Sequence, residues 1–118
     1  MVANPISDML TRIRNAKAVD KETVRVPLSK FRLSLAKTLK RQGVLVSIKK
    51  KERILILGLG KFNTIKAVSK LGQRIYQKSK ELSWKPYGFN IVSTSKGLMT
   101  GRDAKKKGLG GELICEIT

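Results

Sequence analysis

Residues 23–48 read TVRVPLSKFRLSLAKTLKRQGVLVSI, and this stretch decides the fold of the first half of the chain. Its first five residues alternate like a short strand with both valines facing inward, and Pro27 ends that strand. Ser29 then has the side chain and position of a helix N-cap, and Gly43 those of a left-handed C-terminal cap. Residues 44–48 form a second β-rich run. The order strand, helix, strand predicts an α/β layer.

The segments on either side extend this layer. Asn4-Pro5 predicts a helix start, because Asn caps helices and Pro is favoured at the first helical position. The apolar residues that follow recur at helical spacing and form one stripe. They are Ile6, Met9, Leu10, Ile13 and Ala16. Residues 54–57 form another β-rich run, which predicts a hairpin with residues 44–48 whose charged tip is Lys49-Lys50-Lys51-Glu52-Arg53.

The second half of the chain is more strand-like. Residues 65–69 and 74–78 flank the turn-forming sequence Lys70-Leu71-Gly72-Gln73 and predict a hairpin. Residues 65–71 fit a short helix equally well, and the local pattern does not decide between the two.

Two further strands are expected near the carboxyl end, at residues 89–92 and 113–117, with Cys115 buried in the second. Between them, Thr100-Gly101-Arg102-Asp103 has a capping-box pattern and predicts a helix of one or two turns. The whole pattern predicts an α+β fold of two small subdomains, an α/β amino-terminal half and a β-rich carboxyl-terminal half. The predicted subdomains are residues 1–60 and residues 61–118.

Positive charge dominates the composition of these 118 residues. Lys and Arg number 26 and Asp and Glu 8, so the formal net charge is +18 at pH 7. Residues 1–59 contribute +10 and the remainder +8, so the charge is not confined to a tail. A compact chain of this charge repels itself, which indicates a polyanionic partner. Nucleic acid fits such dispersed cations better than a membrane surface does.

Missing residue types exclude several classes of function. The chain has no histidine, so His-based acid–base catalysis and His metal ligation are excluded. A single cysteine can form neither an internal disulfide nor a Cys-rich zinc site. No apolar run approaches the roughly 20 residues of a membrane-spanning helix, and we expect no signal or transit peptide. With no phosphate-binding loop and few scattered carboxylates, we expect no enzyme, no metal and no cofactor.

Two polar, glycine-containing segments have candidate recognition chemistry. Ser93-Thr94-Ser95-Lys96-Gly97 places three hydroxyls and an ammonium after an apolar strand, and hydroxyls can contact a 2′-hydroxyl, a phosphate or a base edge. Gly108-Leu109-Gly110-Gly111-Glu112 ends in a carboxylate that can accept from a base amino group. Both segments fit ordinary turns equally well, with Glu112 in an ion pair.

The cations that lie off the first helical stripe likewise fit either a solvated face or phosphate contacts. They are Arg12, Arg14 and Lys17.

The same segments resemble a known family. Residues 4–16, NPISDMLTRIRNA, are similar to the opening of bacterial-type small-subunit ribosomal protein eight. Residues 93–100 and 108–112 resemble the carboxyl-terminal motifs of that family, in the right order. Residues 26–30 and 74–76 fit the segments between, so the resemblance covers nearly the whole chain.

The resemblance implies a primary rRNA-binding protein that docks on a helix of the central domain of small-subunit rRNA and supports assembly of the platform. It implies neighbouring small-subunit ribosomal proteins as further partners, together with an mRNA that mimics the rRNA site. The ribosome would lie in the cytoplasm, or in a plastid or other organelle that encodes the chain. The residues it assigns to RNA binding are Lys30, Tyr76, Ser93, Thr94, Ser95, Lys96, Gly110, Gly111 and Glu112, with Ser93, Thr94 and Ser95 in a recognition loop. The alternative is a sequence-tolerant nucleic-acid chaperone or an architectural DNA-binding protein.

The chain also departs from the family pattern. Asn4 stands where Asp is usual, and Leu71 stands where Pro is usual. The family's basic contact from the first hairpin has its candidates among Lys49–Lys51. Around Trp84 and Tyr87 the match is poor, and we expect these two aromatic side chains to be packed in the core rather than to stack on RNA.

Overall fold

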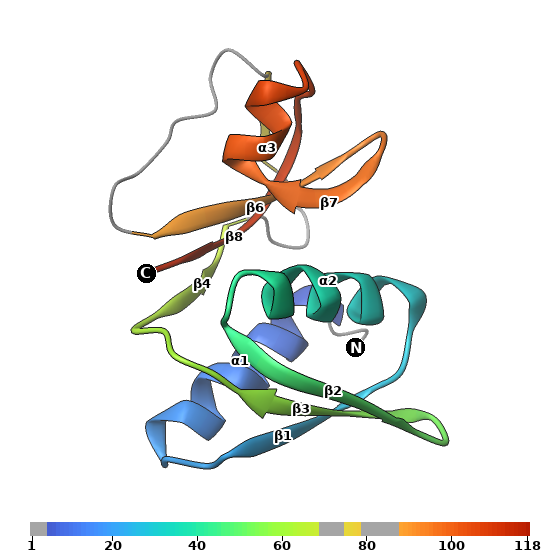
Figure 1. The fold of residues 1–118 in the computed structure, drawn as a ribbon, viewed down its shortest axis with the longest axis vertical. Coiled ribbons are helices and arrows are strands. Elements are labelled where there is room, and N and C mark those ends of the chain that lie inside the picture. Colours follow the sequence, from blue (N-terminus) through green and yellow to red (C-terminus); the bar gives the residue numbers. More distant parts are fainter. Residues whose placement is uncertain (1–4, 69–74, 79–87) are drawn as a thin grey trace. The chain divides into compact units, whose positions relative to one another are not determined.

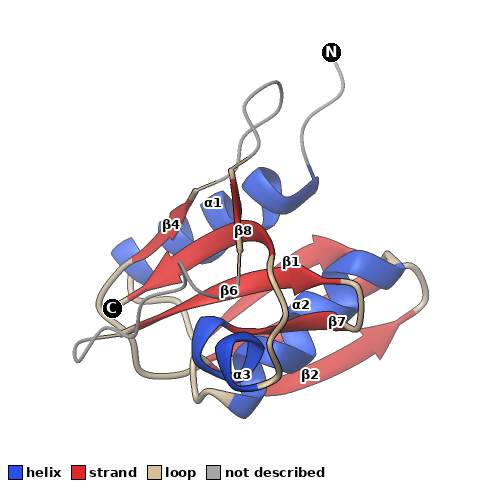
Figure 2. Cartoon of the chain, turned by 90° about the horizontal axis from the view of Figure 1, so that it is seen from above, coloured by secondary structure: helices blue, strands red, loops and turns tan. Residues whose placement is uncertain are grey.

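The computed structural model describes residues 5–68, 75–78 and 88–118. The chain divides into two compact units, Met1–Phe62 and Asn63–Thr118. Each unit combines helix with an antiparallel sheet, as Figures 1 and 2 show. The predicted α+β class is confirmed.

The first unit is built from two helices and a three-stranded sheet. The strand order is β1-β3-β2, so the central strand β3 is antiparallel to both of its neighbours. Both helices can be followed beside this sheet in Figure 1. The elements are α1 (Pro5–Ala18), β1 (Thr23–Pro27), α2 (Lys30–Arg41), β2 (Leu45–Lys51) and β3 (Ile54–Leu59).

Local capping signals place both helices where the sequence predicts them. Helix α1 begins at Pro5, where the missing N–H of proline removes no helical hydrogen bond. Ser29 caps α2, because its Oγ accepts a hydrogen bond from the backbone N–H of Arg32 at 3.1 Å. Past the end of α2, Gly43 has the left-handed φ of +82°. The predicted cap at Asn4 lies outside the described residues.

The helices cover one face of this sheet. The predicted stripe of α1 is buried in full where its side chains are described, at Met9, Leu10, Ile13 and Ala16. On the sheet, Val26, Leu55 and Leu57 are buried beneath the helices. The residues that alternate with these point to the opposite face, because successive side chains of a strand point to opposite sides. The first unit thus has one face of its sheet in its core and one face outside it.

The β2–β3 hairpin corrects the prediction of a five-residue charged tip. Strand β2 continues through Lys49–Lys51, and only Glu52 and Arg53 connect it to β3. Glu52 adopts a left-handed φ of +56°, as tight hairpin turns require. Because β2 is an edge strand, its lysines can extend into solvent while their backbones pair with β3. The three lysines therefore alternate between the two faces of the sheet.

The second unit is organised around its last strand. The sheet order is β4-β8-β6-β7, and β5 also pairs with β8. Helix α3 packs on β6 and β7 and covers a core of Val92, Met99, Ala104 and Leu113. The elements are β4 (Ile65–Ala67), β5 (Tyr76–Gln77), β6 (Phe89–Thr94), β7 (Gly97–Thr100), α3 (Gly101–Lys106) and β8 (Gly111–Ile117).

Pairing along β8 replaces the predicted hairpin between residues 65–69 and 74–78. Strand β4 pairs with residues 115–117 and β5 with residues 111–112, so the two short strands share one long partner. The helical alternative is wrong over Ile65–Ala67, which forms β4. The expected turn at residues 70–73 lies outside the described residues.

Four other features of the second unit follow or extend the prediction. Thr100 caps α3, because its Oγ1 accepts from the N–H of Asp103 at 3.2 Å. Cys115 is fully buried, as expected. Strand β7 has no counterpart in the sequence prediction. The expected strands at residues 89–92 and 113–117 are each two residues longer than predicted.

The cap of α2 gives a direct test of this local structure. Ser29→Ala should lower the free energy of unfolding by about 1 kcal/mol, because the N–H of Arg32 loses its acceptor. Urea unfolding followed by circular dichroism measures the change. The exposed Ser34 in the same helix is the matched control. Ser34→Ala should not lower the stability, since Ala has the higher helix propensity. Equal losses in both variants would contradict the capping role.

Candidate nucleic-acid interface

Four strands of the second unit bring together residues that lie far apart in the sequence. Tyr76 on β5 and Ser93 on β6 are both paired with Glu112 on β8. Leu98 on β7 is paired with Ser93. Residues directly opposite one another on neighbouring strands point to the same face of a sheet. We call this line of four residues, Tyr76, Glu112, Ser93 and Leu98, the cross-strand row.

The cross-strand row presents different chemistry at each strand. Tyr76 is 64% exposed, whereas Ser93 and Glu112 are half-buried. Val92, the neighbour of Ser93, points to the opposite face and packs in the core with α3. Strands lie about 4.8 Å apart, so a phenol ring, a carboxylate and a hydroxyl follow one another at that interval. Such a row offers a stacking surface, an acceptor and a group that both donates and accepts.

Close backbone packing joins the two segments that the sequence singles out. A Cβ at Gly111 would overlap the carbonyl oxygen of Ser93, so only glycine allows β8 to approach β6 this closely. Glu112 follows at once and enters the cross-strand row. Gly110 lies just before β8 and is exposed. The structure therefore brings the predicted site residues Gly110, Gly111 and Glu112 beside Ser93.

The predicted Ser-Thr-Ser loop is for the most part a strand. Ser93 and Thr94 end β6, and only Ser95 and Lys96 form the turn to β7. This corrects the expectation that all three hydroxyls lie in a loop. The cause is the pairing of Thr94 with Gly97 across the β6–β7 hairpin, which extends the strand into its polar residues.

Thr94 holds this turn in place. Its Oγ1 donates to the carbonyl oxygen of Gly97 at 2.8 Å and accepts from the N–H of Lys96 at 3.1 Å. Gly97 supplies the positive φ, +109°, with which the turn re-enters the sheet. The hydroxyl proton of Thr94 is thus committed to the turn. The exposed groups at its tip are the hydroxyl of Ser95 and the ammonium of Lys96.

Lys30, the remaining predicted site residue, belongs to the first unit. It is the first residue of α2 and is exposed. Its ammonium can contact a phosphate without distorting the helix, because the capping bond of α2 is made by Ser29.

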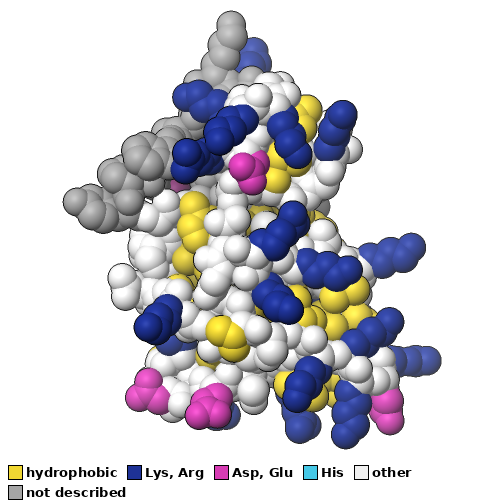
Figure 3. Space-filling model, viewed as in Figure 1, with side chains coloured by type: hydrophobic (Ala, Val, Ile, Leu, Met, Phe, Trp, Pro, Cys, Tyr) yellow, Lys and Arg dark blue, Asp and Glu magenta, His cyan; other side chains and the backbone are white. Residues whose placement is uncertain are grey.

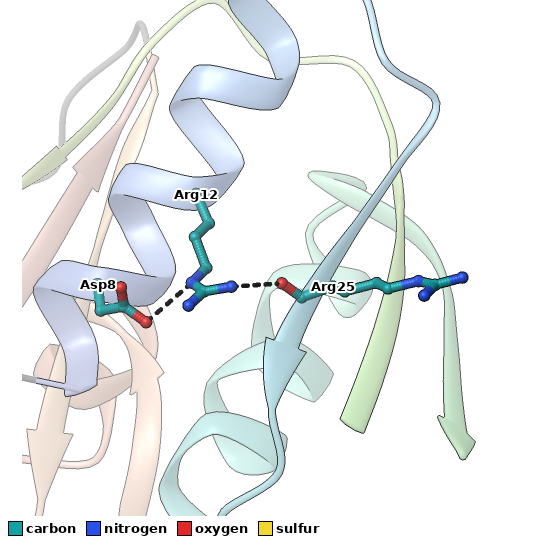
Figure 4. Close-up of polar contacts among 3 residues, drawn as sticks. All are labelled: Asp8, Arg12 and Arg25. Carbon is teal, nitrogen blue, oxygen red and sulfur yellow. Dashed lines mark hydrogen bonds and ion pairs between the residues drawn. The ribbon is translucent and has the colours of Figure 1, made fainter. Parts of the chain in front are cut away.

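Two of the off-stripe cations of α1, Arg12 and Lys17, contact other groups of the first unit, whereas the sequence predicted a solvated face or phosphate contacts for them. Arg12 Nε lies 3.0 Å from Asp8 Oδ2, and Arg12 Nη1 donates to the backbone oxygen of Arg25 at 3.2 Å, as Figure 4 shows. Lys17 Nζ lies 4.5 Å from the centroid of the Phe62 ring, within cation–π distance. The spacing of Asp8 and Arg12, four residues apart in a helix, is the signal that finds the first contact.

A groove lies beside Arg12 in the first unit, with a volume of about 610 Å³. Its lining residues include Arg12, Lys21 and Asn15, while the side chain of Arg25 points away from Arg12, as Figure 4 shows. Among the residues that the structure describes, no carboxylate lines it. The groove therefore favours anions over cations.

The described residues contain neither a reactive thiol nor a group of metal ligands. Burial raises the pKa of the Cys115 thiol to about 12, and the charge of Glu116 adds to that effect, while a hydrogen bond from the Ile91 backbone opposes it. The thiol is therefore protonated and unreactive at neutral pH. Within the described ranges, no three His, Cys, Asp or Glu residues group as metal ligands.

No helix in the described part of the chain is long and apolar enough to cross a membrane. Trp84 and Tyr87 lie outside the described residues.

Comparison with known proteins gives one consistent result. The sequence profile of the family described as "Ribosomal protein S8" matches residues 4–118. The chain is 44% identical to the small ribosomal subunit protein uS8 of Prochlorococcus marinus strain MIT 9301, over 97% of this chain and 96% of the relative. The uS8 of Synechocystis sp. strain PCC 6803 is 44% identical over 95% of both chains. That of Shewanella sediminis is 42% identical, over 97% of this chain and 96% of the relative.

The turn beside the cross-strand row predicts unequal effects of removing its hydroxyls. Thr94→Val should lower the free energy of unfolding by about 1 kcal/mol, because the Gly97 carbonyl and the Lys96 N–H lose their partner. Ser95→Ala should change it by less than about 0.5 kcal/mol, because Ser95 is exposed at the tip. Thermal unfolding of the two variants measures the difference. If the two losses were equal, Thr94 would not be the residue that holds the turn.

Proposed function

This chain belongs to the ribosomal protein S8 family of the small ribosomal subunit, and from that premise we propose that it binds small-subunit rRNA directly. The contact is with a helix of the central domain, and it supports assembly of the platform. The observation that carries the proposal is the cross-strand row with the Ser95–Lys96 turn beside it. The role is structural, in keeping with the family.

The chemistry of the row supports recognition of irregular RNA. An RNA duplex has a deep, narrow major groove that side chains cannot enter, so proteins read its shallow minor groove or its unpaired bases. The exposed ring of Tyr76 can stack on an unpaired base. Ser93 and Ser95 can contact 2′-hydroxyls and base edges, and Glu112 can accept from a base amino group. Specificity in this proposal comes from a few residues of the second unit.

Affinity comes from charge distributed over the whole chain. The formal net charge is +18, and Figure 3 shows Lys and Arg side chains spread over the face drawn, with few Asp or Glu among them. Each phosphate contact releases a counterion, so such a surface binds RNA strongly at low salt. Lys96 beside the row, and Lys30 and the Arg12 groove in the first unit, are the proposed phosphate contacts.

The remaining partners follow from the same site. Neighbouring ribosomal proteins are expected in the subunit, and an mRNA that copies the shape of the rRNA site would bind the same row. The ribosome in question belongs to a bacterial cytoplasm, or to a plastid or other organelle that encodes the chain.

Removing one hydroxyl should separate specific from non-specific binding. Ser95→Ala should weaken binding to a central-domain rRNA fragment by about 1–3 kcal/mol, the cost of leaving a buried polar partner unsatisfied. Binding to an unrelated duplex should hardly change, because phosphate contacts dominate it. Filter binding with both RNAs measures the two affinities, and Ser34→Ala is the control.

Equal weakening on both RNAs would show that Ser95 is only a phosphate contact.

A competition experiment tests the wider proposal with the unmodified protein. If excess duplex DNA displaced the rRNA fragment, the protein would be a sequence-tolerant nucleic-acid binder instead.

Lys30 should affect the salt dependence of binding rather than its specificity. Lys30→Ala should reduce the slope of log affinity against log salt concentration by about one unit, since one phosphate contact is lost. Titrations of the rRNA fragment at several salt concentrations measure the slope. Lys40→Ala, which removes an exposed lysine near the other end of α2, should leave the slope unchanged. An unchanged slope in Lys30→Ala would remove Lys30 from the phosphate contacts.

A further inference from the structure

The groove beside Arg12 in the first unit is lined by apolar side chains as well as cations, and we call it the Arg12 groove. Its lining residues come from the second half of α1, the connection that follows and β1. Ala16 is buried and Val24 is half-buried, but Val19 is 65% exposed. A phosphate gains nothing from aliphatic surface, so a phosphate contact alone leaves the exposed Val19 without a role.

The guanidinium of Arg12 is held in a fixed position at this groove. Its Nε donates to the carboxylate of Asp8 at 3.0 Å, and its Nη1 donates to the backbone oxygen of Arg25 at 3.2 Å (Figure 4). The remaining N–H groups of Arg12 have no partner among the residues that the structure describes. A guanidinium that is already fixed on one side loses little freedom when it binds an anion on the other. Arg12 is therefore preorganised to donate to a phosphate.

Asn15 and Thr23 add uncharged polar groups to the same groove. Both residues are exposed, as is the cation Lys21. The amide of Asn15 can donate and accept at once, as recognition of a base edge requires, and the hydroxyl of Thr23 can bond to a ribose hydroxyl. The Arg12 groove thus has more chemistry than a phosphate alone would use.

These groups match the three parts of a nucleotide. The cations suit its phosphates, the amide and the hydroxyl suit its base edge and sugar, and the aliphatic side chains suit the face of its base. The volume of about 610 Å³ lies within the range of roughly 300–1,000 Å³ that is typical of small-ligand sites. We propose that the Arg12 groove is a nucleotide site, which holds one nucleoside phosphate, either free or unstacked from an RNA. The inference rests on the proposed function for the phosphate contact at this groove and adds the base and the sugar to it.

Calorimetric titration of the unmodified protein without RNA tests the proposal, with ATP and inorganic tripolyphosphate as the two probes. Tripolyphosphate carries at least as much negative charge as ATP but has neither base nor sugar. ATP should bind about tenfold more tightly, because its base covers aliphatic side chains in addition to the phosphate contacts. Equal affinities, or tighter binding of tripolyphosphate, would show attraction by net charge alone and would overturn the proposal.

Two exposed valines of the first unit give a matched pair of variants. Val19 lines the groove and is 65% exposed, whereas Val46 on β2 is 63% exposed and is not among the lining residues. Val19→Asp should weaken ATP binding about tenfold, because a carboxylate then meets the base and repels the phosphates. Val46→Asp changes the net charge by the same amount and should weaken it less than about twofold, because salt screens distant charges. Equal weakening by both variants would contradict binding in the groove.

A lysine pair supplies a second comparison, in case Val19→Asp does not fold. Lys21→Ala removes a cation of the groove and should weaken ATP binding about fivefold, because a charge-assisted contact is lost. Lys40→Ala removes an exposed cation of α2 and should leave the affinity unchanged. If the two variants weakened ATP binding equally, the groove would not be the site.

The central-domain rRNA fragment distinguishes the two sources of the nucleotide. Displacement of ATP by the fragment would assign the groove to a nucleotide of the RNA, and simultaneous binding of both would assign it to a free nucleotide. Ser95 lies in the second unit, so the Ser95→Ala variant should bind ATP as the unmodified protein does. Failure of the proposed RNA site and failure of the nucleotide site are therefore distinguishable.

Discussion

The second unit depends on β8, because this one strand holds three others in register. Strands β4 and β5 lie along one of its edges and β6 along the other. Its approach to β6 requires that Gly111 have no side chain, since the carbonyl of Ser93 occupies the place where a Cβ would stand. From this contact follow the alignment of Tyr76, Glu112 and Ser93 and the position of the turn at Ser95. A chemical surface made from three separate segments thus rests on backbone geometry, which is more rigid than side-chain packing alone.

Positive charge and strand geometry have different roles in this molecule. A net charge of +18 on a compact chain opposes folding through self-repulsion, and a polyanion removes that cost when it binds. The Asp8–Arg12 ion pair contributes little to stability, because both side chains are substantially exposed. In the proposed function the many cations therefore serve affinity more than the fold, while uncharged hydroxyls, one phenol and one carboxylate provide the discrimination.

Local features were predictable from the sequence, and long-range pairing was not. The caps at Ser29 and Thr100 and the buried stripe of α1 depend on residues within one or two helical turns, and the structure has them as predicted. The hairpin of residues 65–69 with 74–78 was wrong because pairing along β8, distant in sequence, competes with local turn formation. Ser93 and Thr94 were placed in a loop because polar residues favour turns, whereas ladder hydrogen bonds extend the strand through them. The sequence singles out the motif segments of the candidate site, but their alignment across strands requires the sheet register.

The hydrogen bond from Arg12 to the backbone oxygen of Arg25 affects whether strand β1 can pair with a strand of another chain. Strand β1 is at the border of its sheet, where unpaired backbone groups can recruit a strand from another chain. Arg12 occupies one outward carbonyl there, and Pro27 has no N–H to offer at the end of the same strand. A second copy would therefore meet an edge already capped by a guanidinium and interrupted by a proline. Strand β1 is thereby blocked as a template for strand addition by a second copy of the chain.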